Sequence, residues 1–323
     1  MKNNSRIRKQ FIEVPLPMSC TFLYKLWVGI KGILFSPLYL VMAHIAGAPG
    51  IGFHLRCAGT AVSLFVAGRI SVKTCYHYLF APMDSTRYFE FHEVWKRAKG
   101  FSFTRYLDVS SPRLMPLLLL RATPAATAEL INPDSEDLKE TNEFAEALGV
   151  KSRCEFIGDT LENARVPSAS FDLVTCISVL EHIPDDAAAL KTIWPLLRPG
   201  GKLILTLPCL SHSLDQYISY NEYGVLKPGD DGYTFWQHYY DNERLESCIY
   251  SVTGKPVYTA IYGEKNRGLF FRNVSMKRVL GARYAFWREP YMMAREYRLF
   301  SSTDELPGEG VIMLEFIKPE KHG

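Results

Sequence analysis

His182 is the clearest candidate for a residue that moves a proton in this 323-residue chain. It stands in Leu180-Glu181-His182, directly after an apolar run. A neutral imidazole near pH 7 can take a proton from an alcohol or a carbon acid, so we interpret His182 as a catalytic base. A packing or turn role for this histidine is the alternative that the sequence leaves open.

A segment rich in aromatic and imidazole side chains, residues 209–240, follows the next apolar run. Amphipathic rings beyond the end of a strand suit a cleft for a sugar or an extended organic molecule, so we expect a substrate loop here. A packed lid with tyrosines in its core is the alternative. The candidate substrate-binding residues are His212, Tyr217, Tyr233 and Trp236.

Two short polar turns could hold a nucleoside cofactor. Ser110 and Ser111 follow the first predicted strand of the sheet, where a ligand must approach the backbone closely. Glu129 lies near the end of the second predicted strand, and Asn132 directly follows it. A polar group at this place can bind ribose hydroxyls. Solvated or purely structural turns at these positions are the alternative.

One strand–helix–strand unit that must position these residues can be read directly. The apolar run Leu173–Ile177 predicts a strand buried on both faces. Pro184-Asp185-Asp186 then caps a helix over Ala187–Leu197, and Pro199-Gly200-Gly201 is predicted to end it. Lys202–Leu207 is the next parallel strand. Such units belong to open sheets whose ligands bind beyond the carboxyl ends of the strands.

Strands and helices also alternate on both sides of this unit, which predicts a doubly wound, Rossmann-like α/β sheet. Further strands are predicted at Arg105–Val109, Ala126–Ile131, Cys154–Ile157, Val257–Tyr262 and Gly310–Lys318, and further helices at Arg87–Ala98, Arg113–Leu120, Ser135–Leu148 and Asp241–Val252.

SFDLVTCISVLEHIPD and LRPGGKLILTLP resemble the fourth-strand and fifth-strand motifs of the class I S-adenosylmethionine-dependent methyltransferases (methyltransferase type 11-like). The resemblance runs from about Tyr106 to the C-terminus, apart from an insertion at 263–307. It implies seven strands with an antiparallel last strand, and S-adenosylmethionine as cofactor. It also implies that Asp108 helps to hold the cofactor's ammonium group, that Ser178 lies at the methionine moiety, and that Asp159, beside Thr160, accepts a hydrogen bond from the adenine amino group.

The first turn departs from the family pattern. Glycines are expected where Ser110, Pro112 and Leu114 stand, and the acid Glu129 falls one position early, which could turn it away from the ribose. A non-catalytic binding or scaffold protein with the same fold is therefore the alternative to an enzyme. A nicotinamide oxidoreductase is disfavoured because no G-x-G-x-x-G follows the first strand.

Residues 1–85 form a basic, apolar, helical N-terminal extension to a methyltransferase-like domain over 86–323. Residues 1–83 carry nine Lys or Arg against the single acid Glu13, and residues 22–40 are strongly apolar. We expect a helix that lies on an anionic membrane surface; a plain helical cap or a true membrane span is the alternative. No basic-aromatic pattern for nucleic acid is evident.

Scattered cysteines indicate a reducing compartment, so we expect a cytoplasmic protein that is peripheral on the inner membrane face. The basic insertion could face lipid head groups or a phosphate-bearing substrate, or be a solvated surface. The sequence predicts methylation of a small or lipid-linked acceptor, with O-methylation of a glycan or glycolipid preferred.

Overall fold

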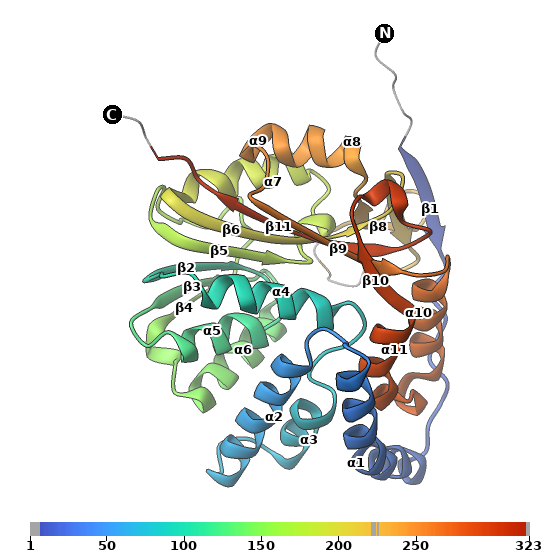
Figure 1. The fold of residues 1–323 in the computed structure, drawn as a ribbon. Coiled ribbons are helices and arrows are strands. Elements are labelled where there is room, and N and C mark those ends of the chain that lie inside the picture. The colour runs from blue at the N-terminus through green and yellow to red at the C-terminus, as the bar shows by residue number, and fades with distance from the viewer. Residues whose placement is uncertain (1–6, 221–223, 225, 321–323) are drawn as a thin grey trace.

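An eight-stranded sheet forms the centre of the molecule in the computed structural model, which describes residues 7–220, 224 and 226–320 (Figure 1). The strand order is β10-β9-β11-β6-β5-β2-β3-β4. The bounds are β2 Arg105–Val109, β3 Thr127–Ile131, β4 Cys154–Ile157, β5 Phe171–Ile177, β6 Leu197–Cys209, β9 Tyr258–Glu264, β10 Tyr297–Phe300 and β11 Gly310–Ile317.

The doubly wound α/β prediction is confirmed. Strands β4, β3, β2, β5 and β6 are parallel, and β11 is antiparallel to both of its neighbours, β6 and β9. The predicted number of seven strands is one too few, because β10 adds an edge strand that pairs antiparallel with β9. Only two of its four residues, Tyr297 and Phe300, are buried, so the sequence gives little strand signal there.

Helices cover both faces of the sheet (Figure 1). One layer contains α4 Arg87–Lys99, α5 Leu114–Ala122 and α6 Ser135–Leu148. The other contains α7 Asp186–Ile193 and a long helix whose parts are α8 Asn242–Arg244, the π-helical turn η4 Leu245–Tyr250 and α9 Ser251–Thr253.

The predicted helix end at Pro199-Gly200-Gly201 is wrong. Helix α7 ends at Ile193, a 3-10 turn continues to Leu196, and the Pro-Gly-Gly residues lie inside β6. Gly200 has a left-handed backbone (φ 74°), and the β5–β6 register shifts beside it. The glycines therefore shape an irregular strand entry instead of ending the helix.

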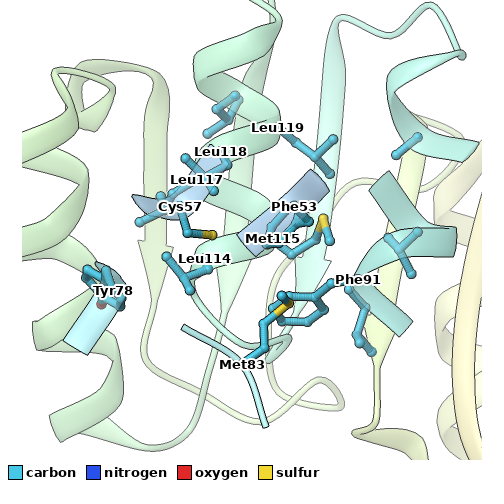
Figure 2. Close-up of a cluster of buried hydrophobic side chains, with 14 of the residues drawn as sticks. Phe53, Cys57, Tyr78, Met83, Phe91, Leu114, Met115, Leu117, Leu118 and Leu119 are labelled. Atoms are coloured by element: carbon cyan, nitrogen blue, oxygen red, sulfur yellow. The ribbon is translucent and has the colours of Figure 1, made fainter. Parts of the chain in front are cut away.

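The N-terminal extension is helical, with α1 Phe22–Ile45, α2 Ile51–Val66 and α3 Val72–Phe80. It shares one buried core with the sheet domain: Phe53 of α2 and Tyr78 of α3 belong to the same apolar cluster as Phe91 of α4 and Met115 of α5 (Figure 2). Because this core is continuous, α2 and α3 are held against the sheet domain by apolar burial.

The basic insertion folds as α10 Leu269–Leu280, α11 Glu289–Glu296 and the edge strand β10. It packs against α1, where Phe35 stacks on Trp287 with ring centroids 6.1 Å apart. The insertion and the N-terminal extension, which are distant in sequence, are therefore neighbours in space (Figure 1).

The expectation of a loop over residues 209–240 is wrong for part of the segment. Two strands, β7 Leu214–Ile218 and β8 Thr234–Tyr239, pair antiparallel there. A strand from the chain's start, β1 Arg8–Ile12, pairs parallel with β7 and completes a separate three-stranded sheet.

Candidate functional site

A cavity of about 530 Å³ opens at the carboxyl ends of β2, β3 and β5. Its far wall comes from the three-stranded sheet, with Trp236 of β8 and Ile218 of β7. The volume is in the range of sites for small molecules and cofactors. The site thus has one wall of strand-end turns and one wall that is mainly apolar and aromatic.

Two serines with left-handed backbones face this cavity. Ser110 follows β2 with φ 50°, and Ser178 follows β5 with φ 49°. Few residues other than glycine adopt this conformation, and the cost is accepted where a site requires it. The Ser110 turn is fixed by its N–H and hydroxyl, which both donate to the carbonyl of Ile131, at 2.8 and 3.0 Å. Ser110 thus adopts the backbone conformation that glycine would give to this turn.

Asp108 and Ser111 lie beneath the turn and are buried. The Asp108 carboxylate accepts the Ser111 N–H at 3.0 Å and the hydroxyls of Tyr106 and Thr175 at 3.1 and 2.5 Å. Burial raises the pKa of Asp108 to about 6. The Ser111 hydroxyl accepts the N–H of Ile177 at 3.0 Å.

Within the described residues, neither side chain forms part of the cavity wall. The Ser111 hydroxyl ties β2 to β5, and its contact with the cofactor stays a prediction. The ammonium-binding role of Asp108 stays a prediction.

Glu129 does not reach the cavity walls that the structure describes, which corrects the first candidate for the ribose hydroxyls. Its carboxylate accepts from Arg105 Nη2 at 2.7 Å, because side chains alternate along β3. The substitute, Asn132, does line the cavity. Its amide donates to Asp137 at 2.8 Å and accepts the N–H of Asp134 at 2.9 Å.

Asp159 and Thr160 form the turn after β4. Thr160 lines the cavity, whereas Asp159 is exposed and, among the described residues, outside the wall. The Asp159 carboxylate accepts the Thr160 N–H at 2.8 Å and the Asn163 amide at 3.2 Å. Asp159 thus shapes the turn, and its contact with adenine stays a prediction.

His182 lines the cavity between its two walls. Its Nδ1 lies 2.6 Å from the carbonyl oxygen of Trp236, which can only accept, so Nδ1 carries the hydrogen and Nε2 is the basic nitrogen. Burial lowers the pKa of His182 to about 4, against the raising effect of this hydrogen bond. The imidazole is therefore neutral at physiological pH.

Two buried acids and an arginine that the sequence interpretation did not place in the site lie near His182. The hydroxyl of Ser178 donates to Glu90 at 2.8 Å, and Arg87, also on the cavity wall, pairs with the same carboxylate at 2.7 Å. Burial raises the pKa of Glu181 to about 8. Arg87 and Glu90 belong to α4, and the only available signal was a charged pair three residues apart on a helix that begins before the methyltransferase motifs.

Of the four predicted substrate residues, Trp236 lies on the cavity wall. Two of the other three contact residues at or beside β1: Tyr217 stacks on Phe11 at 5.2 Å, and the Tyr233 hydroxyl donates to Glu13 at 2.6 Å. His212 lies outside the walls described, with its pKa lowered by burial and by Arg8 and Arg267. Within the described residues, none of these three side chains lines the cavity, and their contact with a substrate stays a prediction.

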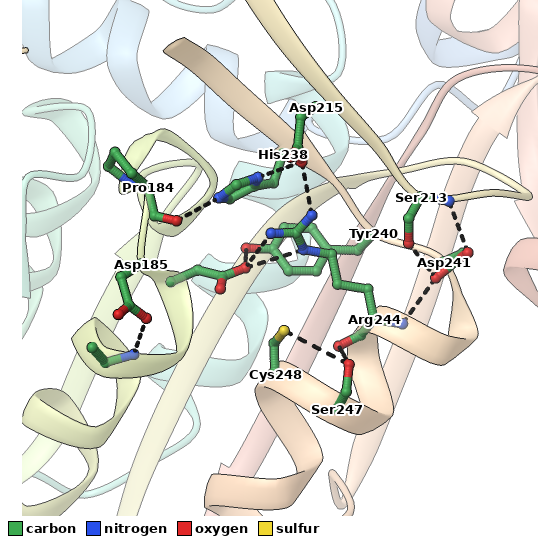
Figure 3. Close-up of polar contacts among 12 residues, drawn as sticks. Pro184, Asp185, Ser213, Asp215, His238, Tyr240, Asp241, Arg244, Ser247 and Cys248 are labelled. Carbon is green, nitrogen blue, oxygen red and sulfur yellow. Dashed lines mark hydrogen bonds and ion pairs between the residues drawn. The ribbon is translucent and has the colours of Figure 1, made fainter. Parts of the chain in front are cut away.

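A buried polar network holds the far wall in place (Figure 3). Asp215 of β7 accepts from His238 at 2.7 Å and from Arg244 at 2.8 Å. Arg244 also pairs with Asp186 at the start of α7 at 3.2 Å, and Tyr240 donates to the same carboxylate at 2.8 Å. Part of the polar character of residues 209–240 therefore supports the wall and does not line it.

Residues 111–205 match the family model described as "Methyltransferase domain". This part of the chain is a methyltransferase domain. The match includes the turns that carry Asn132, Thr160, Ser178 and His182, so the strand-end wall of the cavity belongs to this domain. The methyltransferase type predicted from the motifs is confirmed for these residues.

Curated relatives match over a shorter span. The mitochondrial ubiquinone biosynthesis O-methyltransferase of Schizosaccharomyces pombe is 26% identical over 125 residues, 38% of this chain and 45% of that protein. The ubiquinone biosynthesis O-methyltransferase of Xanthomonas axonopodis pv. citri is 32% identical over 103 residues, 32% of this chain and 42% of that protein. The chain thus spans less than half the length of these relatives.

Among solved structures, the geranyl diphosphate C-methyltransferase of Streptomyces coelicolor A3(2) is similar with a TM-score of 0.44 and 8% identity, over 70% of this chain and 74% of that one. The cyclase SpnF is similar with a TM-score of 0.44 and 16% identity, over 71% and 80%.

The cavity fits the cofactor that the domain implies. The left-handed turns at Ser110 and Ser178 bring backbone to the cavity edge, and Asn132 and Thr160 add polar groups beyond the next strands. These are the features that a nucleoside ligand needs at the end of a doubly wound sheet.

Proposed function

We propose that this protein transfers a methyl group from S-adenosylmethionine to a hydroxyl oxygen of a small or lipid-linked acceptor. The observation that carries the proposal is the cavity itself, which has the turns of the methyltransferase domain on one wall, Trp236 on the other and His182 between them. The relatives named O-methyltransferases support oxygen as the accepting atom.

The residues of the cavity would divide the work. The cofactor, when bound, supplies an electrophilic methyl group; the turns at Ser110 and Ser178, with Asn132 and Thr160, would hold it. The apolar and aromatic far wall would align the acceptor's hydroxyl, since alignment dominates in-line displacement. His182 would accept the hydroxyl proton at Nε2, because Nδ1–H is held by the carbonyl of Trp236.

The acceptor that we propose first is a glycan or glycolipid hydroxyl. Trp236 supports it, because an aromatic face on a cavity wall suits the ring of a sugar. A more acidic, phenol-like hydroxyl is the second candidate. The pKa of His182, near 4, makes it a weak base that removes a proton more readily from an acidic hydroxyl.

Titration calorimetry with S-adenosylmethionine and with S-adenosylhomocysteine tests the site. We expect binding by the native protein and about tenfold weaker binding by Ser110→Val, since a β-branched residue is strained at positive φ. Glu129→Gln is the matched control, because this side chain points away from the cavity, and its affinity should equal that of the native protein.

If the native protein binds neither compound, the enzymatic proposal fails and a scaffold with this fold is favoured. Mass spectrometry of glycolipid and phenol fractions incubated with a labelled methyl donor then identifies the acceptor. Label on nitrogen or carbon would contradict the proposed oxygen acceptor.

A further inference from the structure

We propose that α1, α2 and the start of α3 form a docking surface for an anionic lipid bilayer, on which the protein lies without crossing it. Figure 1 places these helices together at one end of the molecule, away from the central sheet. The docking surface is defined by the exposed apolar side chains of these three helices. The most exposed are Phe22, Leu23, Ile45, Val66 and Val72, each 70 to 81% exposed.

These helices expose more apolar side chains than an ordinary water-facing surface does. Helix α1 has a mean hydropathy of 1.7 over its most apolar window, yet only 22% of that window is buried within the protein. Soluble proteins rarely leave such faces open, and contiguous exposed apolar patches mark interaction sites. The other end of the same surface is formed by Phe65 and Val66, where α2 ends.

Helix α1 is long and apolar enough to cross a membrane by length and composition, but its inner side is attached to the rest of the fold. The Tyr76 hydroxyl of α3 donates to the carbonyl of Gly29 at 2.8 Å. A side chain at Gly32 would collide with Tyr76 and Phe286. A span would pull α1 out of these contacts, whereas an interfacial position keeps them and covers the outer side.

Positive charge on the same helices selects an anionic bilayer. Between Glu13 and Asp84 the sequence contains no acid, while Lys25, Arg56, Arg69 and Lys73 are exposed there. Lys31 lies over the ring of Trp27 at 5.0 Å. Basic residues beside aromatic and aliphatic ones match lipid head groups above acyl chains.

A second cavity, of about 810 Å³, has lining residues from the α2–α3 region and shares three lining residues with the first one. Its lining includes Arg69, which lies between Val66 and Val72 in sequence, and Lys73 at the start of α3. It ends at Arg87, Pro112 and Asp137, which also line the cofactor cavity. On the proposed function, a lipid-linked acceptor would reach the site from the bilayer by this path; the docking surface itself does not depend on that step.

Vesicle co-sedimentation of the full chain tests the docking surface. We expect binding to phosphatidylcholine vesicles that contain about a third phosphatidylglycerol, weaker binding to pure phosphatidylcholine, and a decrease with salt. Leu23→Asp and Val66→Asp should each lower the partition coefficient about tenfold. Val257→Asp and Leu299→Asp, at exposed apolar positions away from α1–α3, are matched controls that should bind like the native protein.

Three results would overturn this inference. The first is an absence of binding to every vesicle. A loss of vesicle binding in the control variants that equals the loss in the α1 and α2 variants counts in the same way. The second is bound protein that resists alkaline carbonate extraction, which indicates a span. The third is a doubled mass in light scattering that Val66→Asp abolishes, which indicates that a second copy of the chain covers this face. Binding is read without any methyl donor, so these results are independent of the calorimetry.

Discussion

At the scale of single residues, the site is built from groups whose charge state is set by burial. Glu181 is protonated near neutral pH because burial raises its pKa to about 8, and the neighbouring His182 is neutral because burial lowers its pKa to about 4. Two adjacent titratable side chains are thus both uncharged near pH 7. Such perturbed pairs are typical of functional sites.

Glu181→Gln should change the pH dependence of stability. The pKa of Glu181 rises from 4.5 in the unfolded chain to about 8 in the folded one, so unfolding releases a proton between these values. The free energy of unfolding of the native protein therefore falls as pH rises through this window. The variant should be more stable than the native protein by at least about 1 kcal/mol near pH 9. This difference in stability should be smaller near pH 6.

Urea unfolding at both pH values measures this difference. Glu136→Gln, on the exposed side of α6, is the surface control and should show no pH-dependent gain. A constant difference between Glu181→Gln and native protein across the range would contradict the role given to burial.

His182→Gln should lower kcat/KM for an alcohol acceptor by about 10²-fold or more, since positioned general bases contribute that much. The native profile should stay flat down to about pH 5, because the pKa of His182 is near 4 and the neutral form persists. Steady-state rates across pH test this expectation. A native rate that falls on acidification with a midpoint near pH 6.5 would show that burial does not set the pKa of His182.

At the scale of elements, the turns that face the cavity depend on local caps. The Asp134 carboxylate caps α6 by accepting the N–H groups of Glu136 and Asp137 at 3.0 and 3.1 Å. Asp134→Ala should cost about 1 kcal/mol of stability, and Asp134→Ser should restore most of it. Denaturant midpoints measure both variants. Equal losses for Ala and Ser would show that the cap is not the cause.

Elements with strong local signals could be predicted to the residue. Helix α6 begins after Asp134 and ends at Gly149 with φ 73°, as its cap and its glycine indicate. Strand β4 has a similar local pattern, and its predicted bounds are the observed ones. In such cases, the information that fixes an element lies within a few residues of it.

The rest depended on contacts far apart in the chain. The far wall of the cavity requires β1 to pair with β7 more than 200 residues later, and nothing near Arg8 specifies that partner. A shift of one residue along β3 reverses the side to which the Glu129 side chain points. The sequence motif alone therefore did not fix that direction. Arg87 entered the site because α4 packs over the sheet, which only the tertiary structure shows.

At the scale of the whole molecule, Gly32 permits the close packing of α1 on α3 and the insertion. Gly32→Ala should destabilise the protein, because the added carbon would meet Tyr76 and Phe286. Gly59→Ala in α2 is the matched control: space there is open, so it should be neutral or raise stability by about 0.5 kcal/mol. Thermal unfolding compares the two. Similar melting temperatures for both variants would mean that α1 is loosely held.

The parallel pairing of Arg8–Ile12 with Leu214–Ile218 also bears on the order in which the protein can be completed. During synthesis, β1 leaves the ribosome about 200 residues before its partner β7, and an unpaired strand is a template for wrong association. The insertion on which the first apolar helix rests follows later still. The cavity's far wall can therefore close only after β7 has been made, and chaperone dependence during synthesis should concentrate in β1 and α1.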